Sequence, residues 1–223
     1  MGEVRMRNFE AVVFDMDGVI FDSEAKVVEC WIETAEKHNI KDIETLCRMC
    51  LGTNSAETRR IALEFYGEDF PYDEYKKEMS DLYHSRYDGG RLPMKPYIRE
   101  LLTFLKENGV KIALASSTRS IVVNNQLRDA GILPYFDKVV CGDMVSRSKP
   151  APDIFLKACE ELGVPPENAY AIEDSYNGIR SAHSAGMRPI MVPDMAPPTE
   201  EMEKLAEVIL PSLNEVIEYL GKE

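Results

Sequence analysis

The amino-acid sequence predicts a protein of the α/β class, in which a parallel sheet is covered by helices on both faces and interrupted by a helical insertion. Three observations support this. After Pro93, short and almost wholly apolar segments alternate with helical ones, which is typical of a parallel sheet. A similar apolar segment, Asn8 to Asp15, lies near the start of the chain. The stretch from Ser23 to about Gly89 has helical periodicity throughout.

The elements before Pro93 follow from apolar periodicity and from capping residues. Asn8 to Asp15 is apolar and rich in β-branched residues, so it is expected to form a buried strand. Ser23 is expected to cap a helix that carries Val27. Asn54 with Glu57 resembles a capping box at the start of a later helix.

After Pro93, strands and helices are expected to alternate, and Gly109 and Gly131 are expected to end the first two helices. The expected strands are VKIALAS (110–116), DKVVCG (137–142), AYAIED (169–174), RPIMV (188–192) and a short strand at 208–210. The expected helices are 95–108, 120–130, 152–162, 177–185 and a last one opened by MAPPTEE (195–201).

The inserted helices are expected to form a cap. In open α/β sheets, ligands bind beyond the carboxyl ends of the strands, and the insertion leaves from that end of the first strand. We therefore predict an α/β core domain from residues 1–22 and 92–223, and a helical cap domain from residues 23–91. The hinges are expected around 21–23 and around 89–93.

The formal net charge is −13, from 39 acidic and 26 basic side chains. This charge argues against a nucleic-acid partner, which would require a basic face. It also means that an anionic substrate needs local positive charge. No apolar run suggests a membrane span and no secretory signal is visible, so we expect a cytoplasmic protein with no membrane partner. The five scattered cysteines predict no disulfide framework. We expect a monomer, with a dimer as the alternative.

Polar residues follow the apolar strands at the edge where a ligand is expected. Each of them alone has a structural explanation, such as a helix cap or a solvated loop. Their convergence on one edge of the sheet favours a functional site instead. They are Asp15 and Asp17 after the first strand, Ser116, Ser117 and Thr118 after the second, Lys149 after the third, and Glu173 and Asp174 after the fourth.

These groups are suited to phosphoryl transfer. Asp15, Asp17 and Asp174 offer the oxygen ligands that Mg²⁺ prefers, and a divalent cation allows neighbouring carboxylates to stay ionised. Ser116 and backbone N–H groups at a helix start can hold phosphate oxygens. Lys149 adds positive charge at the site. A carboxylate can also act as the nucleophile and form an aspartyl-phosphate.

With these motifs, the sequence resembles the haloacid dehalogenase-like (HAD) superfamily. The matching stretches span nearly the whole chain: FDMDGVIFDSE (14–24), LASST (114–118), SKPAPDIF (148–155) and AIEDSYNGIRSAHSAGM (171–187). The chain is most similar to the branch with a helical cap after the first strand, which includes β-phosphoglucomutase and phosphoglycolate phosphatase. The resemblance implies a Rossmann-like parallel sheet core, Mg²⁺ as cofactor and a small phosphate ester as substrate.

The resemblance also implies roles for the acidic residues. Asp15 would be the nucleophile, and Asp17 would be the general acid and then the general base. Mg²⁺ would be held by Asp15, the backbone carbonyl of Asp17 and Asp174, with Glu173 as a further or indirect ligand. The dehalogenases lack the second acid of the first motif, so Asp17 favours phosphoryl transfer over C–Cl hydrolysis.

The remaining predicted contacts lie on the second and third strand ends and on the cap. The phosphoryl group would be bound by Ser116, Ser117 and Lys149, with Lys149 also orienting Asp15. A cap loop is expected to reach towards Asp15 and contact the substrate through Gly52, Thr53 and Asn54.

A mutase is the alternative to a phosphatase. The mutases carry a histidine in the first cap helix where this chain has Val27, and an arginine in the cap loop where alignment on Gly52 gives Ser55. Arg59 and Arg60 follow, and the sequence leaves open whether either reaches the substrate. We expect a Mg²⁺-dependent phosphatase of a small phosphorylated metabolite such as a sugar phosphate, with a β-phosphoglucomutase-type mutase as the alternative. A regulatory protein without turnover is disfavoured, because it would not need Asp17 as an acid and base.

Overall fold

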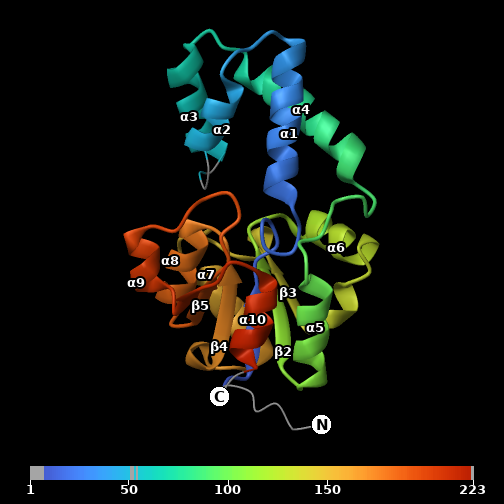
Figure 1. Ribbon diagram of the computed structural model, residues 1–223, viewed down its shortest axis with the longest axis vertical. Helices are drawn as coiled ribbons and strands as arrows, with labels where there is room; N and C mark the ends of the chain where they lie inside the picture. Colours follow the sequence, from blue (N-terminus) through green and yellow to red (C-terminus); the bar gives the residue numbers. More distant parts are fainter. Residues whose placement is uncertain (1–7, 51–52, 54, 222–223) are drawn as a thin grey trace.

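The computed structural model describes residues 8–50, 53 and 55–221, and its centre is a six-stranded parallel sheet with the strand order β3-β2-β1-β4-β5-β6. The α/β class predicted from the sequence is confirmed. β1, which comes first in the chain, lies in the middle of the sheet between β2 and β4 (Figure 1). The strands are β1 Ala11–Phe14, β2 Lys111–Ser116, β3 Lys138–Cys141, β4 Ala169–Glu173, β5 Arg188–Met191 and β6 Val208–Ile209.

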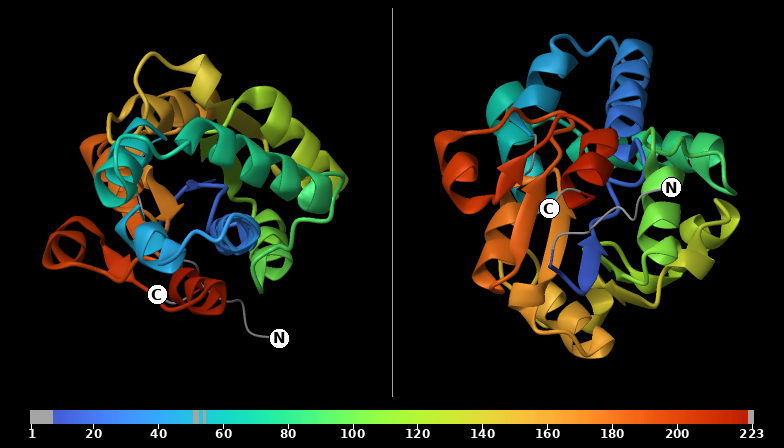
Figure 2. Two further views of the ribbon diagram at one scale, coloured as in Figure 1. Left: turned by 90° about the horizontal axis from the view of Figure 1, so that it is seen from above. Right: turned by 60° about the horizontal axis from the view of Figure 1, so that its bottom comes forward.

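Helices cover both faces of the sheet, so every central strand is buried. Alternation along β1 sends Val12 and Phe14 to one face and Ala11 and Val13 to the other. The first face packs against α5 Ile98–Glu107, α6 Ser120–Asp129 and α10 Leu213–Leu220. The second packs against α7 Asp153–Leu162 and α8 Tyr176–Ser184, while α9 Glu200–Leu205 packs on α8 and the end of β5. Figure 2 shows this layering in two further views.

The four helices between β1 and α5 form a separate layer over the carboxyl edge of the sheet (Figure 1). They have an apolar cluster of their own, to which Cys30, Trp31, Leu46, Ala62 and Tyr75 belong. The helices are α1 Ser23–Lys37, α2 Ile43–Met49, α3 Ser55–Tyr66 and α4 Tyr72–Tyr87. We call these four helices the cap; the division into a core domain (1–22 and 92–223) and a cap domain (23–91) stays a prediction.

The two linkers between the core and the cap are paired with each other. Phe21 and Met94 form an antiparallel bridge. The N–H of Asp22 donates to the carbonyl of Pro93 at 2.9 Å. The N–H of Lys95 donates to the carbonyl of Ile20 at 2.8 Å. The chain therefore enters and leaves the cap at adjacent points, through a short hydrogen-bonded ribbon.

Two details of the predicted elements need correction. Ser23 is not a helix cap: it is the first residue of α1, and its hydroxyl bonds to a side chain of the core instead. The final helix, α10, was not predicted; it begins after Ser212, whose side chain accepts from the N–H of Asn214. Asn54 of the predicted capping box lies outside the described residues. No helix in the described part of the chain is long and apolar enough to cross a membrane.

Candidate active site

Three buried carboxylates meet at the carboxyl edge of the sheet. Asp15 directly follows β1, and its N–H donates to the carbonyl of Ile172 at 3.0 Å, which extends the pairing of β1 with β4. Glu173 is the last residue of β4 and Asp174 follows it. Oxygen atoms of Asp15, Glu173 and Asp174 all lie within 4.8 Å of one another. The edge predicted from the sequence thus brings these acids together.

Lys149 lies beside this cluster and is almost completely buried, with 7% of its side chain exposed. Its ammonium group donates to Asp15, to Glu173 at 2.6 Å and to the carbonyl of Ala115 at 2.9 Å. Burial opposes the charged form, but Asp15 and Glu173 raise the pKa of Lys149 above its ordinary value. Lys149 is therefore a fixed positive charge in contact with Asp15, and its role in orienting a nucleophile stays a prediction.

One lysine does not neutralise three carboxylates. Burial raises the pKa of Asp15, Lys149 lowers it, and the charges of Glu173 and Asp17 raise it again, so that it lies at about 8. Burial, followed by the charge of Glu173 and then Asp15, also raises the pKa of Asp174 well above its ordinary value. Without a further cation, the ionised cluster is unfavourable. Clustered carboxylate oxygens in an otherwise acidic pocket are the donor set that Mg²⁺ prefers, so the residues present fit this ion.

Two glycines allow the backbone to approach the carboxylates closely. Gly18 has a φ of +79°, and a Cβ atom added to it would overlap the carboxyl group of Asp174. A Cβ atom added to Gly178, in the first turn of α8, would overlap the carboxyl group of Glu173. A larger residue at either position would overlap a carboxyl group, and at Gly18 it would also have to adopt an unfavourable positive φ. The loop after β1 and the start of α8 therefore restrict the positions of Asp174 and Glu173.

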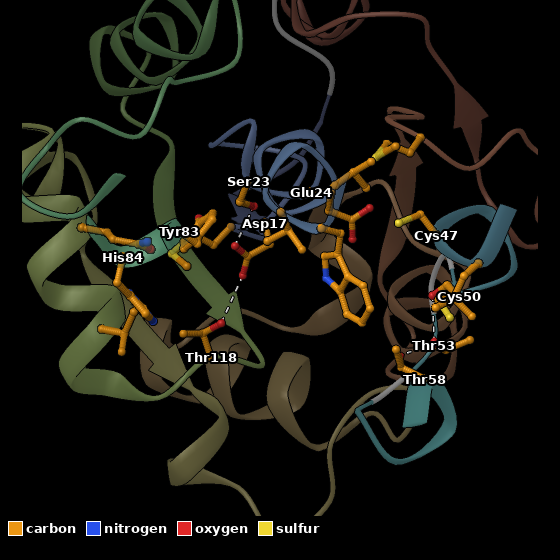
Figure 3. A pocket seen from close by; sticks show the side chains of 18 residues that line it. Asp17, Ser23, Glu24, Cys47, Cys50, Thr53, Thr58, Tyr83, His84 and Thr118 are labelled. Atoms are coloured by element: carbon orange, nitrogen blue, oxygen red, sulfur yellow. Dashed lines mark hydrogen bonds between the residues drawn. The ribbon is translucent and has the colours of Figure 1, made fainter. Parts of the chain in front are cut away.

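The carboxyl group of Asp17 is bonded by one residue of the cap and one of the core. Its Oδ1 accepts a hydrogen bond from Ser23 at 2.8 Å and its Oδ2 accepts one from Thr118 at 3.1 Å (Figure 3). Its carboxylate does not belong to the three-acid cluster. The two acids of the first motif thus have different surroundings, which suits a division between nucleophile and acid/base. Metal binding through the backbone carbonyl of Asp17 stays a prediction.

The two predicted phosphate-binding serines differ from each other. Ser116 is fully buried, and its hydroxyl accepts from the N–H of Thr118 at 3.1 Å. Ser117 is exposed to solvent. The carbonyl of Ala115, next to Ser116, accepts from Lys149, so the end of β2 lies beside the cluster. Binding of phosphate by either serine stays a prediction. Thr118, which the sequence places in the same group of polar residues without a role of its own, contacts Asp17 directly.

A cavity of about 420 Å³ lies between the cap and the core, with Asp17 in its wall. From the core it is lined by Asp17, Thr118 and Gln126, among others. From the cap it is lined by residues of α1, α2 and α4 and by Thr53 and Thr58. In Figure 3, Glu24, Asp17 and Thr118 lie around this space with Cys47, Cys50 and Thr53 on the far side. The volume is in the range of small-molecule sites.

The predicted cap loop is described only at Thr53, which lines the cavity. Its hydroxyl donates to the carbonyl of Cys50 at 2.7 Å and lies 2.9 Å from the hydroxyl of Thr58. Gly52 and Asn54 lie outside the described residues. Burial raises the pKa of Cys47 to about 11, so the C-x-x-C pair contributes neutral thiols to the wall rather than reactive thiolates.

A second acidic group, which the sequence analysis did not identify, joins the cap to the site. Glu24 of α1, Asp174 and Asp194 lie within 4.8 Å of one another. Burial, and then the charges of Asp194 and Asp17, raise the pKa of Glu24 to about 7. Lys95 pairs with Asp194 at 2.5 Å. In the sequence, Glu24 lies at the end of the first motif and Asp194 lies after an apolar strand. Neither position distinguishes an acid of the site from an acid on the surface.

The chain is similar to known proteins over most of its length. Residues 9–186 match the family model of the haloacid dehalogenase-like hydrolases. The chain is 36% identical to a phosphorylated carbohydrates phosphatase of Thermotoga maritima over 81% of this chain and 83% of that protein. It is 33% identical to a beta-phosphoglucomutase of Bacillus subtilis over 80% of each chain.

The solved structure of CbbY from Rhodobacter sphaeroides in complex with phosphate has the same fold. It superposes with a TM-score of 0.71 at 29% identity, covering 93% of this chain and 96% of that one. The family expected from the motifs is thereby confirmed. The chain therefore belongs to the haloacid dehalogenase-like hydrolase family, and it is an enzyme of the phosphatase type.

Proposed function

We propose that this hydrolase is a Mg²⁺-dependent phosphatase that acts on a small phosphorylated metabolite through an aspartyl-phosphate on Asp15. The observation that carries the proposal is the buried contact of Lys149 with Asp15 and Glu173, beside Asp174. This arrangement holds one carboxylate in place while leaving the site in need of a further cation. It matches what phosphoryl transfer requires: a fixed nucleophile and positive charge around the phosphoryl oxygens.

In the first half of the reaction, an oxygen of Asp15 attacks phosphorus as the bond to the leaving oxygen breaks. Lys149 neutralises charge on the phosphoryl oxygens and keeps Asp15 in line. Asp17 in its protonated form gives its proton to the leaving oxygen, so that a neutral alcohol departs. Ser23 and Thr118 hold the Asp17 carboxyl group at the cavity wall for this transfer.

In the second half, Asp17 is a carboxylate and takes a proton from a water molecule. The oxygen of that water attacks phosphorus, the bond from phosphorus to Asp15 breaks, and inorganic phosphate leaves. Both residues then have their starting protonation states. Closure of the cap over the cavity would exclude other water from the first half.

Asp15, Asp174 and Glu173 are the residues that would hold Mg²⁺, with the backbone carbonyl of Asp17 as a further donor. The ion would supply Lewis-acid stabilisation of the phosphoryl oxygens and would allow the clustered carboxylates to stay ionised together.

A phosphorylated sugar or a similar compound is the substrate class that the Thermotoga maritima relative supports, since that protein is named a phosphatase of phosphorylated carbohydrates. A β-phosphoglucomutase-type mutase is the alternative, because a relative carries that name. The cavity wall favours hydrolysis: Val27, where the resemblance implies a histidine in the mutases, is a wall residue without an ionisable group.

The purified protein incubated with Mg²⁺, β-glucose 1-phosphate and a trace of the 1,6-bisphosphate tests the proposal. We expect release of inorganic phosphate that stops when Mg²⁺ is chelated. Efficient formation of glucose 6-phosphate without phosphate release would show a mutase instead. The Asp15→Asn variant should lose turnover towards every ester, and wild-type activity in it would contradict the assignment of the nucleophile.

A further inference from the structure

A large part of the cavity wall is apolar. Val27 and Trp31 of α1 lie in this wall together with Leu46 of α2 and Val122 of α6. Trp31 is 7% exposed and packs against the rings of Tyr72 and Tyr75, so its indole is held in place. A ligand that fills this space would be in contact with a fixed apolar surface.

The described part of the same wall contains no permanently charged cation. Among the described residues that line the cavity, none is lysine or arginine, and the acids are Asp17 and Glu24. His84 lines it too, and its Nδ1 lies 3.0 Å from Asp88, to which it is bonded. Positions 51, 52 and 54, outside the described residues, are occupied by leucine, glycine and asparagine, which carry no charge.

The nearby basic residues of the cap are engaged elsewhere. Arg59 pairs with Asp73 at 3.3 Å on the outer surface. Arg60 is exposed and pairs with Glu57 at 2.6 Å. Lys76 donates to the hydroxyl of Ser55, at the position where the resemblance implies an arginine in the mutases. None of these three basic side chains is part of the cavity wall.

A second phosphate group on the substrate would therefore enter this cavity without a partner. Desolvating such a dianion without a cation is strongly unfavourable, and the carboxylates of Asp17 and Glu24 would repel it. The net charge of −13 adds to this repulsion. Lys149 is already in contact with Asp15 and Glu173, at the place of the transferred phosphoryl group.

We infer that the cavity selects a phosphate monoester with a single phosphate, whose alcohol part is uncharged and presents an apolar or planar face to Trp31 and Val27. This inference rests on the proposed function and adds the substrate class. Gln126 supplies one polar contact: it lines the cavity, and its buried Oε1 has no hydrogen-bond partner among the described residues. A hydroxyl or N–H group of the alcohol part would satisfy it.

Two pairs of esters test the selectivity of the wild-type enzyme with Mg²⁺. Glucose 6-phosphate is compared with glucose 1,6-bisphosphate, and benzyl phosphate with 3-phosphoglycerate. We expect kcat/KM to be at least about tenfold higher for the first member of each pair. Equal or higher values for the bisphosphate and for the charged ester would overturn the inference.

A charge placed in the wall should change the selectivity. Val27→Lys should raise kcat/KM for the bisphosphate at least about tenfold relative to the monophosphate. Ile121→Lys is the matched control, because Ile121 is 66% exposed and precedes the wall residue Val122 without lining the cavity. This variant adds the same charge outside the cavity and should leave kcat/KM unchanged for both esters. If both variants behaved alike, the cavity wall would not be the determinant. Trp31→Phe should raise KM for benzyl phosphate several-fold while leaving kcat nearly unchanged.

Binding to the Asp15→Asn variant separates this inference from the proposed function. Calorimetry on this variant measures affinity without turnover. We expect benzyl phosphate and glucose 6-phosphate to bind at least about tenfold more tightly than the bisphosphate. That result supports the inference even if no ester is hydrolysed by the wild type, in which case only the proposed function fails. Tighter binding of the bisphosphate would overturn the inference whatever the turnover.

Discussion

Ser23, the first residue of the cap, donates a hydrogen bond of 2.8 Å to Oδ1 of Asp17, which belongs to the core. Thr118, at the end of β2, holds the other oxygen of the same carboxyl group at 3.1 Å. The proposed acid/base is therefore held jointly by the cap and by the core. A change in the position of the cap would act directly on the orientation of Asp17.

The Ser23→Ala substitution should lower kcat about tenfold with little change in KM, because the carboxyl group loses one of its two fixed partners while the cavity wall stays intact. Ser85→Ala is the control, since Ser85 also lies on a cap helix but donates only to the carbonyl of Leu82. Steady-state kinetics over a range of pH values measures the effect. An unchanged kcat and pH profile in Ser23→Ala would show that Thr118 alone suffices.

Lys149→Met should abolish turnover and destabilise the fold by about 3 to 5 kcal/mol, because it leaves Asp15 and Glu173 buried without their cation. Lys106→Met removes a surface pair with Asp137 and should cost less than about 1 kcal/mol. Denaturant unfolding of both variants without metal compares the two losses. Equal losses would contradict the assignment of Lys149 as the charge that holds the cluster together.

Gly18→Ala should reduce Mg²⁺-dependent turnover at least about tenfold, because the added methyl group would displace Asp174. Gly109→Ala is matched to it: its φ is +72°, close to the +79° of Gly18, and nothing lies near the added atom. Both variants should lose about 1 kcal/mol of stability from the backbone. Titration of activity with Mg²⁺ should show that Gly18→Ala alone needs a higher Mg²⁺ concentration for half-maximal activity. An unchanged concentration in Gly18→Ala would contradict a role of Gly18 in positioning a metal ligand.

The metal-free protein should lose stability as the pH rises. Asp15 has an ordinary pKa of 3.8, and burial raises it to about 8 in the folded protein, so between these values the folded state binds more protons than the unfolded state. The contribution of Asp15 to the free energy of unfolding is then fully present below its ordinary pKa of 3.8. It is lost as the pH rises through its folded-state pKa of about 8. The pKa of Asp174 is raised as well and acts in the same direction.

Thermal unfolding in the presence of a chelator, at about pH 5 and about pH 8.5, measures this dependence. Mg²⁺ should remove most of the difference, because it binds the ionised carboxylates and stabilises the folded state at the higher pH. Asp174→Asn should make the metal-free curve flatter. A metal-free protein that is more stable at the higher pH would contradict the described charge state of the cluster.

The convergence of Asp15, Glu173, Asp174 and Lys149 could be predicted from the sequence. Parallel strands place their carboxyl ends on one edge of the sheet, which is enough to expect acids at these ends to converge. The structure adds that β1 and β4 are neighbours, which brings Asp15 beside Glu173 and Asp174. The local preference of serine for helix caps gave a wrong result at Ser23, because a tertiary partner, Asp17, is close enough to bond its hydroxyl.

The cavity wall could not be predicted. Val27 and Trp31 have the helical spacing of buried residues. This spacing is the same whether the helix face packs against another helix or borders a cavity, as it does here. Glu24 had the appearance of an ordinary acid in the first turn of a helix, and its burial near Asp194 depends on how the cap sits on the core. The amino-acid order therefore predicts which acids and which lysine meet at this edge of the sheet, but not which residues form the cavity wall.

The paired linkers have a consequence for how such a protein can change. Because Phe21 and Met94 lie opposite each other, the helices between them are joined to the core at what amounts to a single point of attachment. A different set of helices could be spliced in at these two positions without breaking any strand pairing of the six-stranded sheet. The segments that build the sheet and the segment that builds the cap are thus separate in the chain and joined at one place, while the surroundings of Asp17 and the cavity wall draw on both.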